Sequence, residues 1–333
     1  MLDKTSILLI GLGSIGKRHL RNILSLGYTA ISIVSRSGKL PEEFDRLPVY
    51  DSLDKALAHQ KFDAAVICTP TALHMATLMP LLDAGIKNIY VEKPVSHNYE
   101  GITEVINKSK EYNTRIIVGF DLHYDCGLQK VKELIVSNAI GTIVSANAQV
   151  GQYLPDWRPH EDYRLGMSAR KETGGGVMLD LVHEFDYLYW LLGDVETIAS
   201  FNNNSGSLEI ETEDVAEVLL KFGNGAIGTI HLDYLQPKLV RNCMLTGSNG
   251  SIFWNLVDSN VKWIDSQKQE QEFSYAGFER NDRFINIIKD FLEKNDNAFT
   301  TSLQQGLQSL RMVLAAKYSS EKNVFVNLNQ FNH

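Results

Sequence analysis

The stretch Leu8-Leu-Ile-Gly-Leu-Gly-Ser-Ile-Gly-Lys-Arg-His19 decides the fold, because an apolar run breaks into three glycines and then resumes with helical spacing. Gly11 permits a tight turn after a strand, Gly13 lets the backbone approach a pyrophosphate, and Gly16 allows close packing of helix on sheet. The start of a helix also offers free N–H groups to phosphate oxygens. Residues 11–16 are therefore predicted to bind a dinucleotide, with Ser14 and Ile15 among the contacts. The alternative is a strand–turn–helix whose glycines serve packing only.

A second strand is predicted at 30–34, and it ends at Ser35-Arg36-Ser37. About 20 residues beyond the glycines, an acidic residue normally binds the ribose 2′-hydroxyl. No carboxylate lies in this turn, whereas the guanidinium of Arg36, helped by Ser35, suits a 2′-phosphate. The turn therefore favours NADP(H) over NAD(H). A solvated basic turn without a binding role is the alternative.

Further strands are predicted at 64–68, 89–91 and 115–120, with helices between them. This alternation predicts right-handed crossovers and an α/β fold with a doubly wound parallel sheet. Ligands bind such sheets at the carboxyl ends of the strands. Thr69 and Pro70 follow one of these strands, and Glu92 and Lys93 follow the next, so the sequence places them with the glycines at one crevice.

Lys93 is the first candidate for chemistry. Pro94 biases its backbone away from the helical region, so the lysine is expected to be extended at the end of a strand. There, an ammonium can hold a substrate hydroxyl and stabilise alkoxide character during oxidation. Glu92 is adjacent and can orient it. An exposed lysine without function is the alternative.

From residue 142 the chain becomes rich in β-forming segments. Strands are predicted at 143–150, 198–201, 215–222, 226–234, 241–246 and 251–255, followed by helices at 278–292 and 303–318. Asn249-Gly250 indicates a hairpin between the last two strands. We therefore expect a dinucleotide-binding domain at 1–122, and a substrate-binding and oligomerisation α/β domain with an open, mainly antiparallel sheet at 123–333.

The segment 152–164 is too long and irregular for a tight connection, and loops of this kind are often functional. Its aromatic and basic residues suit a polyhydroxylated or anionic ligand, because rings stack on sugar faces and guanidinium groups bind carboxylate or phosphate. The residues concerned are Trp157, Arg158, Tyr163 and Arg164. A lid or interface loop without substrate contacts is the alternative.

Gly174-Gly-Gly176 precedes Asp180 and His183. If this segment is helical, the two side chains share a face. His183 has the intrinsic pKa to take and return a hydroxyl proton near neutrality. Asp180 can then orient its ring or hold a second hydroxyl, although a structural histidine at a helix start is the alternative. The spacing His183-Glu184-x-Asp186 does not match a zinc helix, so no metal is predicted.

Composition excludes several classes of protein. The chain has 333 residues, is 44% hydrophobic and carries a net charge of −8. That charge, without a basic cluster, argues against nucleic-acid binding. Neither a signal peptide nor a membrane-spanning segment is expected. Three widely spaced cysteines fit a reduced compartment, so a cytoplasmic location is expected.

These residues together resemble the Gfo/Idh/MocA family of glucose–fructose oxidoreductases, inositol dehydrogenases and related sugar dehydrogenases. The likeness extends through Thr69-Pro70 with His74, Glu92-Lys93-Pro94, Asp180 with His183, and Thr246-Gly-Ser-Asn-Gly250. It implies a Rossmann domain and a second domain whose open sheet commonly mediates dimers or tetramers. It also implies NAD(P), a sugar substrate, cofactor contacts from His74 and Glu92, and catalysis by Lys93 and His183 with an upstream aspartate.

Two positions depart from the family pattern. Asp180 lies three residues before His183, where the family usually has four, and His123 and Cys126 stand where arginine and proline are common. The segment from Tyr153 to Arg164 resembles a branch found with bacterial surface sugars, which points to an amino sugar, nucleotide sugar or sialic-acid-like substrate. The alternatives are a non-catalytic regulator with the same fold and an enzyme that recycles a tightly held cofactor.

Overall fold

The computed structural model describes residues 5–331. Residues 1–4, to which the expectation that no signal peptide is present also applies, and residues 332–333 lie outside that range. The chain divides into two compact units, one formed by Met1–Asp121 with Arg280–Gly306 and the other by Leu122–Glu279 with Leu307–His333. Within residues 5–331, no helix combines the length and the apolar character that crossing a bilayer requires.

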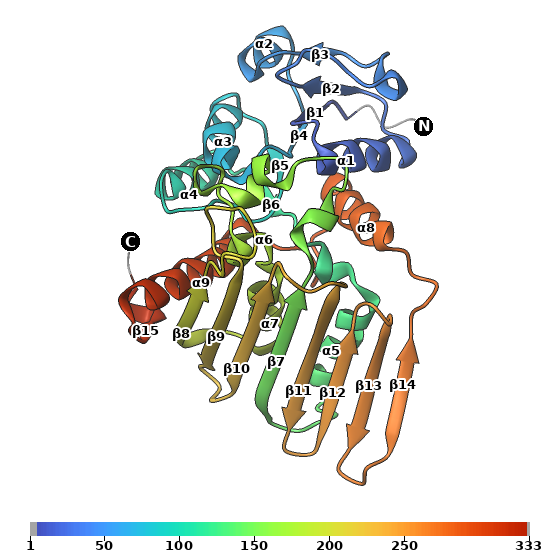
Figure 1. Ribbon diagram of the computed structural model, residues 1–333. Coiled ribbons are helices and arrows are strands. Elements are labelled where there is room, and N and C mark those ends of the chain that lie inside the picture. The colour runs from blue at the N-terminus through green and yellow to red at the C-terminus, as the bar shows by residue number, and fades with distance from the viewer. Residues whose placement is uncertain (1–4, 332–333) are drawn as a thin grey trace. The chain divides into compact units, whose positions relative to one another are not determined.

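The first unit is built on a six-stranded parallel sheet in the order β3-β2-β1-β4-β5-β6. Its strands are β1 (Ile7–Ile10), β2 (Ile31–Val34), β3 (Val49–Tyr50), β4 (Ala64–Ile67), β5 (Asn88–Val91) and β6 (Arg115–Val118). Its helices are α1 (Ser14–Ser25), α2 (Leu53–His59), α3 (His74–Asp83), α4 (Ile102–Glu111) and α8 (Arg280–Leu292). The predicted doubly wound sheet is confirmed (Figure 1).

Residues 280–306 join this first unit, although the sequence placed them in the second domain. The reason is aromatic packing: the ring of Phe284 lies 6.1 Å from that of His19 on α1, and the ring of Phe291 lies 5.6 Å from that of Tyr90 on β5. The chain then runs along the edge of the sheet, where the amide of Val118 donates to the carbonyl of Thr301 at 2.9 Å. Burial of α8 thus completes the core of the first unit.

The second unit contains a nine-stranded sheet in the order β14-β13-β12-β11-β7-β10-β9-β8-β15, antiparallel except where β7 pairs with β10. Its strands are β7 (Ile143–Gly151), β8 (Val195–Asn203), β9 (Val215–Phe222), β10 (Ile227–Asp233), β11 (Val240–Gly247), β12 (Gly250–Asn255), β13 (Asn260–Asp265), β14 (Glu270–Ser274) and β15 (Val326–Asn327). The expected mainly antiparallel sheet is confirmed, and the predicted hairpin joins β11 to β12. β13, β14 and β15 were not among the strands predicted from the sequence.

One face of this second sheet is covered by helices. They are α5 (Cys126–Val136), α6 (Val177–Asp180), α7 (His183–Leu192) and α9 (Leu303–Lys322). Figure 1 shows α5 and α7 behind the strands. On β9, buried residues alternate with more exposed ones, as a strand with one covered face requires. The apolar face of the sheet therefore packs against helices, and the opposite face carries the alternate residues.

Candidate active site

The glycine turn of the first unit fits a phosphate group. Gly11 has φ +94°, and a Cβ on Gly16 would lie 2.0 Å from the carbonyl oxygen of Gly11, so both positions require glycine. Above Gly13, by contrast, a Cβ would meet nothing within 4 Å. α1 begins immediately after it, with no side-chain cap and no acidic residue in its first turn. The helix N-terminus is thus open to an anion, and the residues present fit the pyrophosphate of a dinucleotide.

The turn after β2 carries the cationic side chain of Arg36 and contains no acidic residue. Arg36 is exposed, and its neighbours Ser35 and Ser37 face each other with their hydroxyl oxygens 3.1 Å apart. Residues 35–40 contain no carboxylate. The turn therefore offers a guanidinium and two hydroxyls at the carboxyl end of a strand next to β1.

Glu92 fixes the backbone that leads to Lys93. Its Oε1 lies 2.6 Å from Nε2 of buried His19 and accepts a hydrogen bond from the Tyr90 hydroxyl, while its Oε2 accepts one from the amide of Lys93 at 3.3 Å. Burial alone would raise the pKa of Glu92, but the bond and charge of His19 hold that pKa below its ordinary value. Glu92 therefore remains an anion that anchors the loop, and half-buried Lys93 projects from a fixed position before a cis peptide bond to Pro94.

His74 connects the two loops that follow β4 and β5. Its Nδ1 lies 2.9 Å from the carbonyl oxygen of Pro94, and its Nε2 lies 3.0 Å from that of Thr69. Burial lowers the pKa of His74, so the ring is neutral and donates to one carbonyl at a time. Thr69 keeps a buried hydroxyl for which residues 5–331 supply no hydrogen-bond partner. This hydroxyl is available to a ligand at the carboxyl end of β4.

In the second unit, Asp180 is held by a residue that the sequence analysis did not single out. The hydroxyl of Tyr234, directly after β10, donates to Asp180 Oδ2 at 2.7 Å. Burial and the nearby carboxylate raise the pKa of Tyr234 well above its ordinary value, so it stays a donor. The alternation Gly228, Ile230, Leu232 along β10 places Tyr234 on the covered face, and that period was the available signal.

Asp180 and His183 do not belong to one continuous helix, so the condition for a shared helical face is not met. α6 ends at Asp180, and Leu181 has φ −100° and ψ 34°, which interrupts the helix before α7 begins at His183. Both side chains are nonetheless almost fully buried, each with 6% exposure. The break means that Asp180 and His183 are positioned by different contacts.

The loop 152–164 folds as short 3-10 turns with contrasting side chains. Trp157 packs edge-on against Tyr234, with ring centroids 5.4 Å apart, so this aromatic does reach the residue that holds Asp180. Arg164 instead pairs with Asp162 at 2.8 Å and with Glu209 at 3.3 Å. Tyr163 accepts a hydrogen bond from the amide of Glu209 on its hydroxyl oxygen, and exposed Arg158 lies 3.8 Å from Glu161. Arg164 is thus already paired with two carboxylates, one in the loop and one outside it.

The acidic residues after His183 have partners of their own. Glu184 Oε1 lies 2.9 Å from Nε of Arg241, and Asp186 Oδ2 lies 2.8 Å from Nε2 of His123. Among the residues the structure describes, no group of three or more His, Cys, Asp and Glu side chains is arranged to hold a metal ion. These carboxylates belong to ion pairs inside the second unit.

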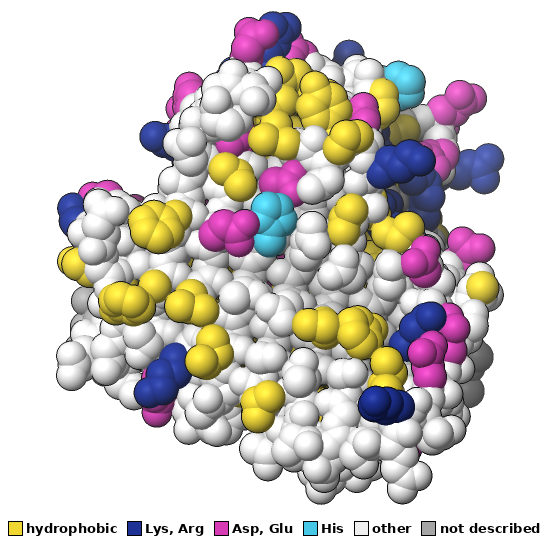
Figure 2. Space-filling view, turned by 60° about the horizontal axis from the view of Figure 1, so that its bottom comes forward, with side chains coloured by type: hydrophobic (Ala, Val, Ile, Leu, Met, Phe, Trp, Pro, Cys, Tyr) yellow, Lys and Arg dark blue, Asp and Glu magenta, His cyan; other side chains and the backbone are white. Residues whose placement is uncertain are grey.

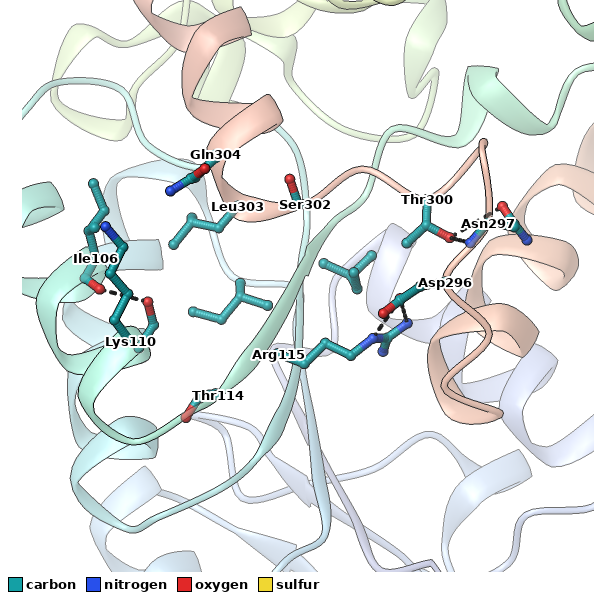
Figure 3. A pocket seen from close by; sticks show the side chains of 13 residues that line it. Ile106, Lys110, Thr114, Arg115, Asp296, Asn297, Thr300, Ser302, Leu303 and Gln304 are labelled. Carbon is teal, nitrogen blue, oxygen red and sulfur yellow. Dashed lines mark hydrogen bonds and ion pairs between the residues drawn. The ribbon is translucent and has the colours of Figure 1, made fainter.

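A cavity of about 420 Å³ in the first unit lies away from these residues. Figure 3 shows it between α4, β6 and the segment 296–304, with the Arg115–Asp296 ion pair on one side. Its lining includes Thr114 and Arg115 at the start of β6, whereas ligands of such sheets bind at the carboxyl ends. None of the predicted site residues lines it.

Comparison with known proteins gives the family. Residues 5–120 match the oxidoreductase family with an NAD-binding Rossmann fold, and residues 128–253 match the GFO/IDH/MocA C-terminal domain. The chain belongs to the Gfo/Idh/MocA family. The resemblance stated from the motifs is therefore confirmed, and the NAD-binding oxidoreductase class comes with it.

Individual members of the family share the full length. Myo-inositol 2-dehydrogenase from Thermotoga maritima is 26% identical over 96% of this chain and 98% of its own length. The WlbA dehydrogenase from Bordetella pertussis, solved in complex with NADH and UDP-GlcNAcA, is 23% identical, with a TM-score of 0.82 over 98% of this chain and 99% of that one. Levoglucosan dehydrogenase, in complex with NADH and levoglucosan, is 18% identical with a TM-score of 0.86, covering 98% of this chain and 100% of that one. The WlbA and levoglucosan dehydrogenase structures therefore have the same fold as this chain.

Proposed function

We propose that this protein is an NAD(P)-dependent dehydrogenase that transfers hydride between a nicotinamide cofactor and a hydroxyl or keto group of a sugar derivative. The observation that carries the proposal is that the predicted catalytic residues of both units lie beside side chains held by hydrogen bonds. Lys93 follows a loop anchored by Glu92 and His19, while buried Asp180 is held by Tyr234 three residues before His183.

Each side chain has a distinct role in this proposal. The ammonium of Lys93 polarises the reacting oxygen, and His183 takes the hydroxyl proton during oxidation and returns it during reduction. Asp180, with one oxygen held by Tyr234, orients His183 or Lys93 relative to the substrate. When bound, the nicotinamide cofactor supplies the hydride acceptor or donor, and the turn 11–16 holds its phosphates.

Single substitutions of Lys93 and His183 test this proposal. Lys93→Ala and His183→Ala should each lower kcat by about a hundredfold or more, because positioned acid–base groups contribute that much. The cofactor Kd, measured by titration of nicotinamide fluorescence, should stay within about threefold of wild type, a change below 1 kcal/mol. Exposed residues of the first unit supply matched controls, Lys110→Ala and His59→Ala. Near-normal turnover in both site variants contradicts the proposal, whereas retained cofactor binding without turnover of any sugar by the wild type favours a regulator.

For the cofactor, we propose NADP(H) in preference to NAD(H). Exposed Arg36 in a turn without carboxylates supports it. Arg36→Ala should raise the Kd for NADPH about tenfold while changing the Kd for NADH little, since a charged hydrogen bond contributes about 1.5–3 kcal/mol. Arg21→Ala is the matched control, because Arg21 is an exposed cation of the same unit that pairs with Glu43 at 2.6 Å. Equal changes for both cofactors would count against the preference.

For the substrate, we propose an amino sugar, nucleotide sugar or sialic-acid-like acid. Trp157 supports a sugar ring, because its own ring contacts Tyr234, which in turn binds Asp180. The complex of the WlbA dehydrogenase with UDP-GlcNAcA also supports this class. Arg158, exposed and only loosely paired, is the better cation of the loop for an anionic group, since Arg164 is bound by two carboxylates. Turnover measured across sugar acids, nucleotide sugars and inositol ranks these substrates.

We propose that the protein assembles as a dimer or tetramer through the face of the second sheet that carries no helices. Strand pairing places four exposed apolar residues on that face: Phe201, Leu219, Ile227 and Phe253. Figure 2 shows one face of the molecule, and on it apolar side chains, drawn in yellow, reach the surface at several separate points. Light scattering coupled to gel filtration measures the assembly, and Phe201→Asp should weaken it.

A further inference from the structure

Asp186, in the first turn of α7, contacts residues of two other elements. It is 1% exposed, and its Oδ2 lies 2.8 Å from Nε2 of His123 in the 3-10 turn Asp121–Tyr124. Its Oδ1 accepts a hydrogen bond from the Ser309 hydroxyl on α9 at 3.0 Å. A buried carboxylate requires such partners, because an uncompensated charge in the interior is unfavourable. One oxygen of Asp186 therefore accepts a hydrogen bond from Ser309, and the other lies close to the imidazole of His123.

His123 also contacts the next turn of the same helix. Its ring stacks on that of Trp190, with centroids 4.4 Å apart and planes 19° from parallel. The ammonium of Lys132 on α5 donates to the carbonyl of Trp190. A single imidazole thus touches two successive turns of α7, through its contact with Asp186 and its stack on Trp190, and this restricts rotation of the helix about its axis.

The geometry matters because His183 is the first residue of α7. Residues three apart on a helix share a face, so the orientation of Asp186 fixes that of His183. We propose that His123 is a positioning residue that, through Asp186, sets the orientation of the His183 imidazole. This inference rests on the proposed function, in which His183 is the acid–base residue, and it gives α7 a second support besides packing.

Two substitutions of His123 test the inference. His123→Gln removes the imidazole that faces Asp186 and stacks on Trp190, and it should lower kcat about tenfold or more, as small misplacements of reacting groups do. The KM for the cofactor should not change, because the cofactor turn belongs to the first unit. His123→Arg supplies a planar guanidinium that can pair with Asp186 and stack on Trp190, and it should recover most of the lost kcat. His59→Gln, at an exposed histidine, is the matched control.

A second readout does not depend on turnover. With isotope-labelled histidine in the full chain, the ring resonance of His183, assigned by its loss in His183→Ala, should shift in His123→Gln and return toward wild type in His123→Arg. Ser309→Ala, which removes only the hydroxyl bonded to Asp186, should shift the same resonance in the same direction by less. It also serves if His123→Gln does not fold.

The outcomes separate this inference from the proposed function. An unshifted His183 resonance with unchanged kcat in folded His123→Gln, even with a lower Tm, overturns the positioning role and leaves a purely structural pair. Near-normal turnover in Lys93→Ala and His183→Ala overturns the proposed function, while the resonance still reports whether His123 orients His183. A shifted resonance with lowered kcat and recovery by His123→Arg supports both.

Discussion

The two units build their candidate site residues in different ways. In the first unit, the glycine turn is contiguous in sequence, and Glu92 contacts the amide of its neighbour Lys93, although distant His19 also contacts its carboxylate. In the second unit, Asp180 is held by Tyr234, and Asp186 by His123 and Ser309, all far away in sequence. Arg164 pairs with nearby Asp162 and also with distant Glu209. A motif of neighbouring residues can be recognised in the sequence. Whether a given side chain remains available to a ligand, however, depends on contacts with residues far away in sequence.

The largest expected effect is in the contiguous part of the first unit. Gly16→Ala puts a Cβ 2.0 Å from the carbonyl oxygen of Gly11, so the turn must open, and we expect at least about 2 kcal/mol of lost stability with loss of cofactor binding. Gly13→Ala meets no protein atom within 4 Å, so the Tm should hold while the cofactor Kd rises about tenfold or more. Thermal unfolding and cofactor titration measure both.

Gly223→Ala is the control for the general effect of a methyl group at glycine, because its Cβ would make only ordinary contacts, from 3.6 Å, in the second unit. If Gly13→Ala binds cofactor as wild type does, the open space above Gly13 is not where the phosphate approaches. The glycine turn would then no longer be an example of a binding site built from neighbouring residues.

An intermediate effect is expected where the second unit relies on a distant residue. Tyr234→Phe removes the hydroxyl that donates to Asp180, and a hydrogen bond to a charged group contributes about 1.5–3 kcal/mol. We expect kcat to fall about tenfold, with the cofactor Kd unchanged. Tyr187→Phe is the matched control, since Tyr187 is also fully buried in this unit but faces Cys243. Equal losses in the two variants would show that the Asp180 contact has no special role.

The smallest effect concerns a histidine on the face of the second sheet that carries no helices. His231 Nε2 lies 2.9 Å from Asp233 and Nδ1 lies 2.6 Å from Glu217. The bond to Asp233, followed by that to Glu217, raises the pKa of His231 to about 9. Because the folded-state pKa is raised, this stabilisation is complete below the unfolded value of about 6.5 and is lost as the pH rises through about 9.

His231→Gln should therefore lower the Tm by about 2–4 °C near pH 6, a change worth about 1 kcal/mol, and by much less at pH 10. Thermal unfolding across this pH range measures the difference, with His59→Gln as the exposed control. A loss of Tm that is the same at both pH values would mean that the two carboxylates do not depend on the imidazolium.

Much of the architecture followed from the sequence because its signals are local. The buried strands of the first sheet, the glycine turn and the alternation on β9 and β10 need no distant partner to be recognised. β14, Glu-Gln-Glu-Phe-Ser, was missed because it has almost no apolar alternation and pairs only with β13. The break between α6 and α7 was missed because neither glycine nor proline marks it at Leu181-Val182.

For the candidate site, the sequence showed which residue types are present, but it did not show which of their side chains are free to bind a ligand. Arg36 and Arg164 both suggested anion binding, yet Asp162 and Glu209 already neutralise Arg164. Glu92 suggested cofactor contact, yet its carboxylate is engaged by His19 and Tyr90. Such competition for a charged side chain arises only when the chain is folded, so single-position reasoning cannot foresee it.

The return of residues 280–306 to the first unit has a consequence for biosynthesis. Phe284 and Phe291 pack on His19 and Tyr90, so the ribosome must synthesise strands β7 to β14 of the second unit before the first unit receives its last hydrophobic partners. The nascent nucleotide-binding half therefore carries uncovered aromatic surface for some 160 residues of synthesis, the length of Leu122–Glu279. The first unit is complete once Gly306 has been synthesised, and the second unit, whose last segment begins at Leu307, is completed after it.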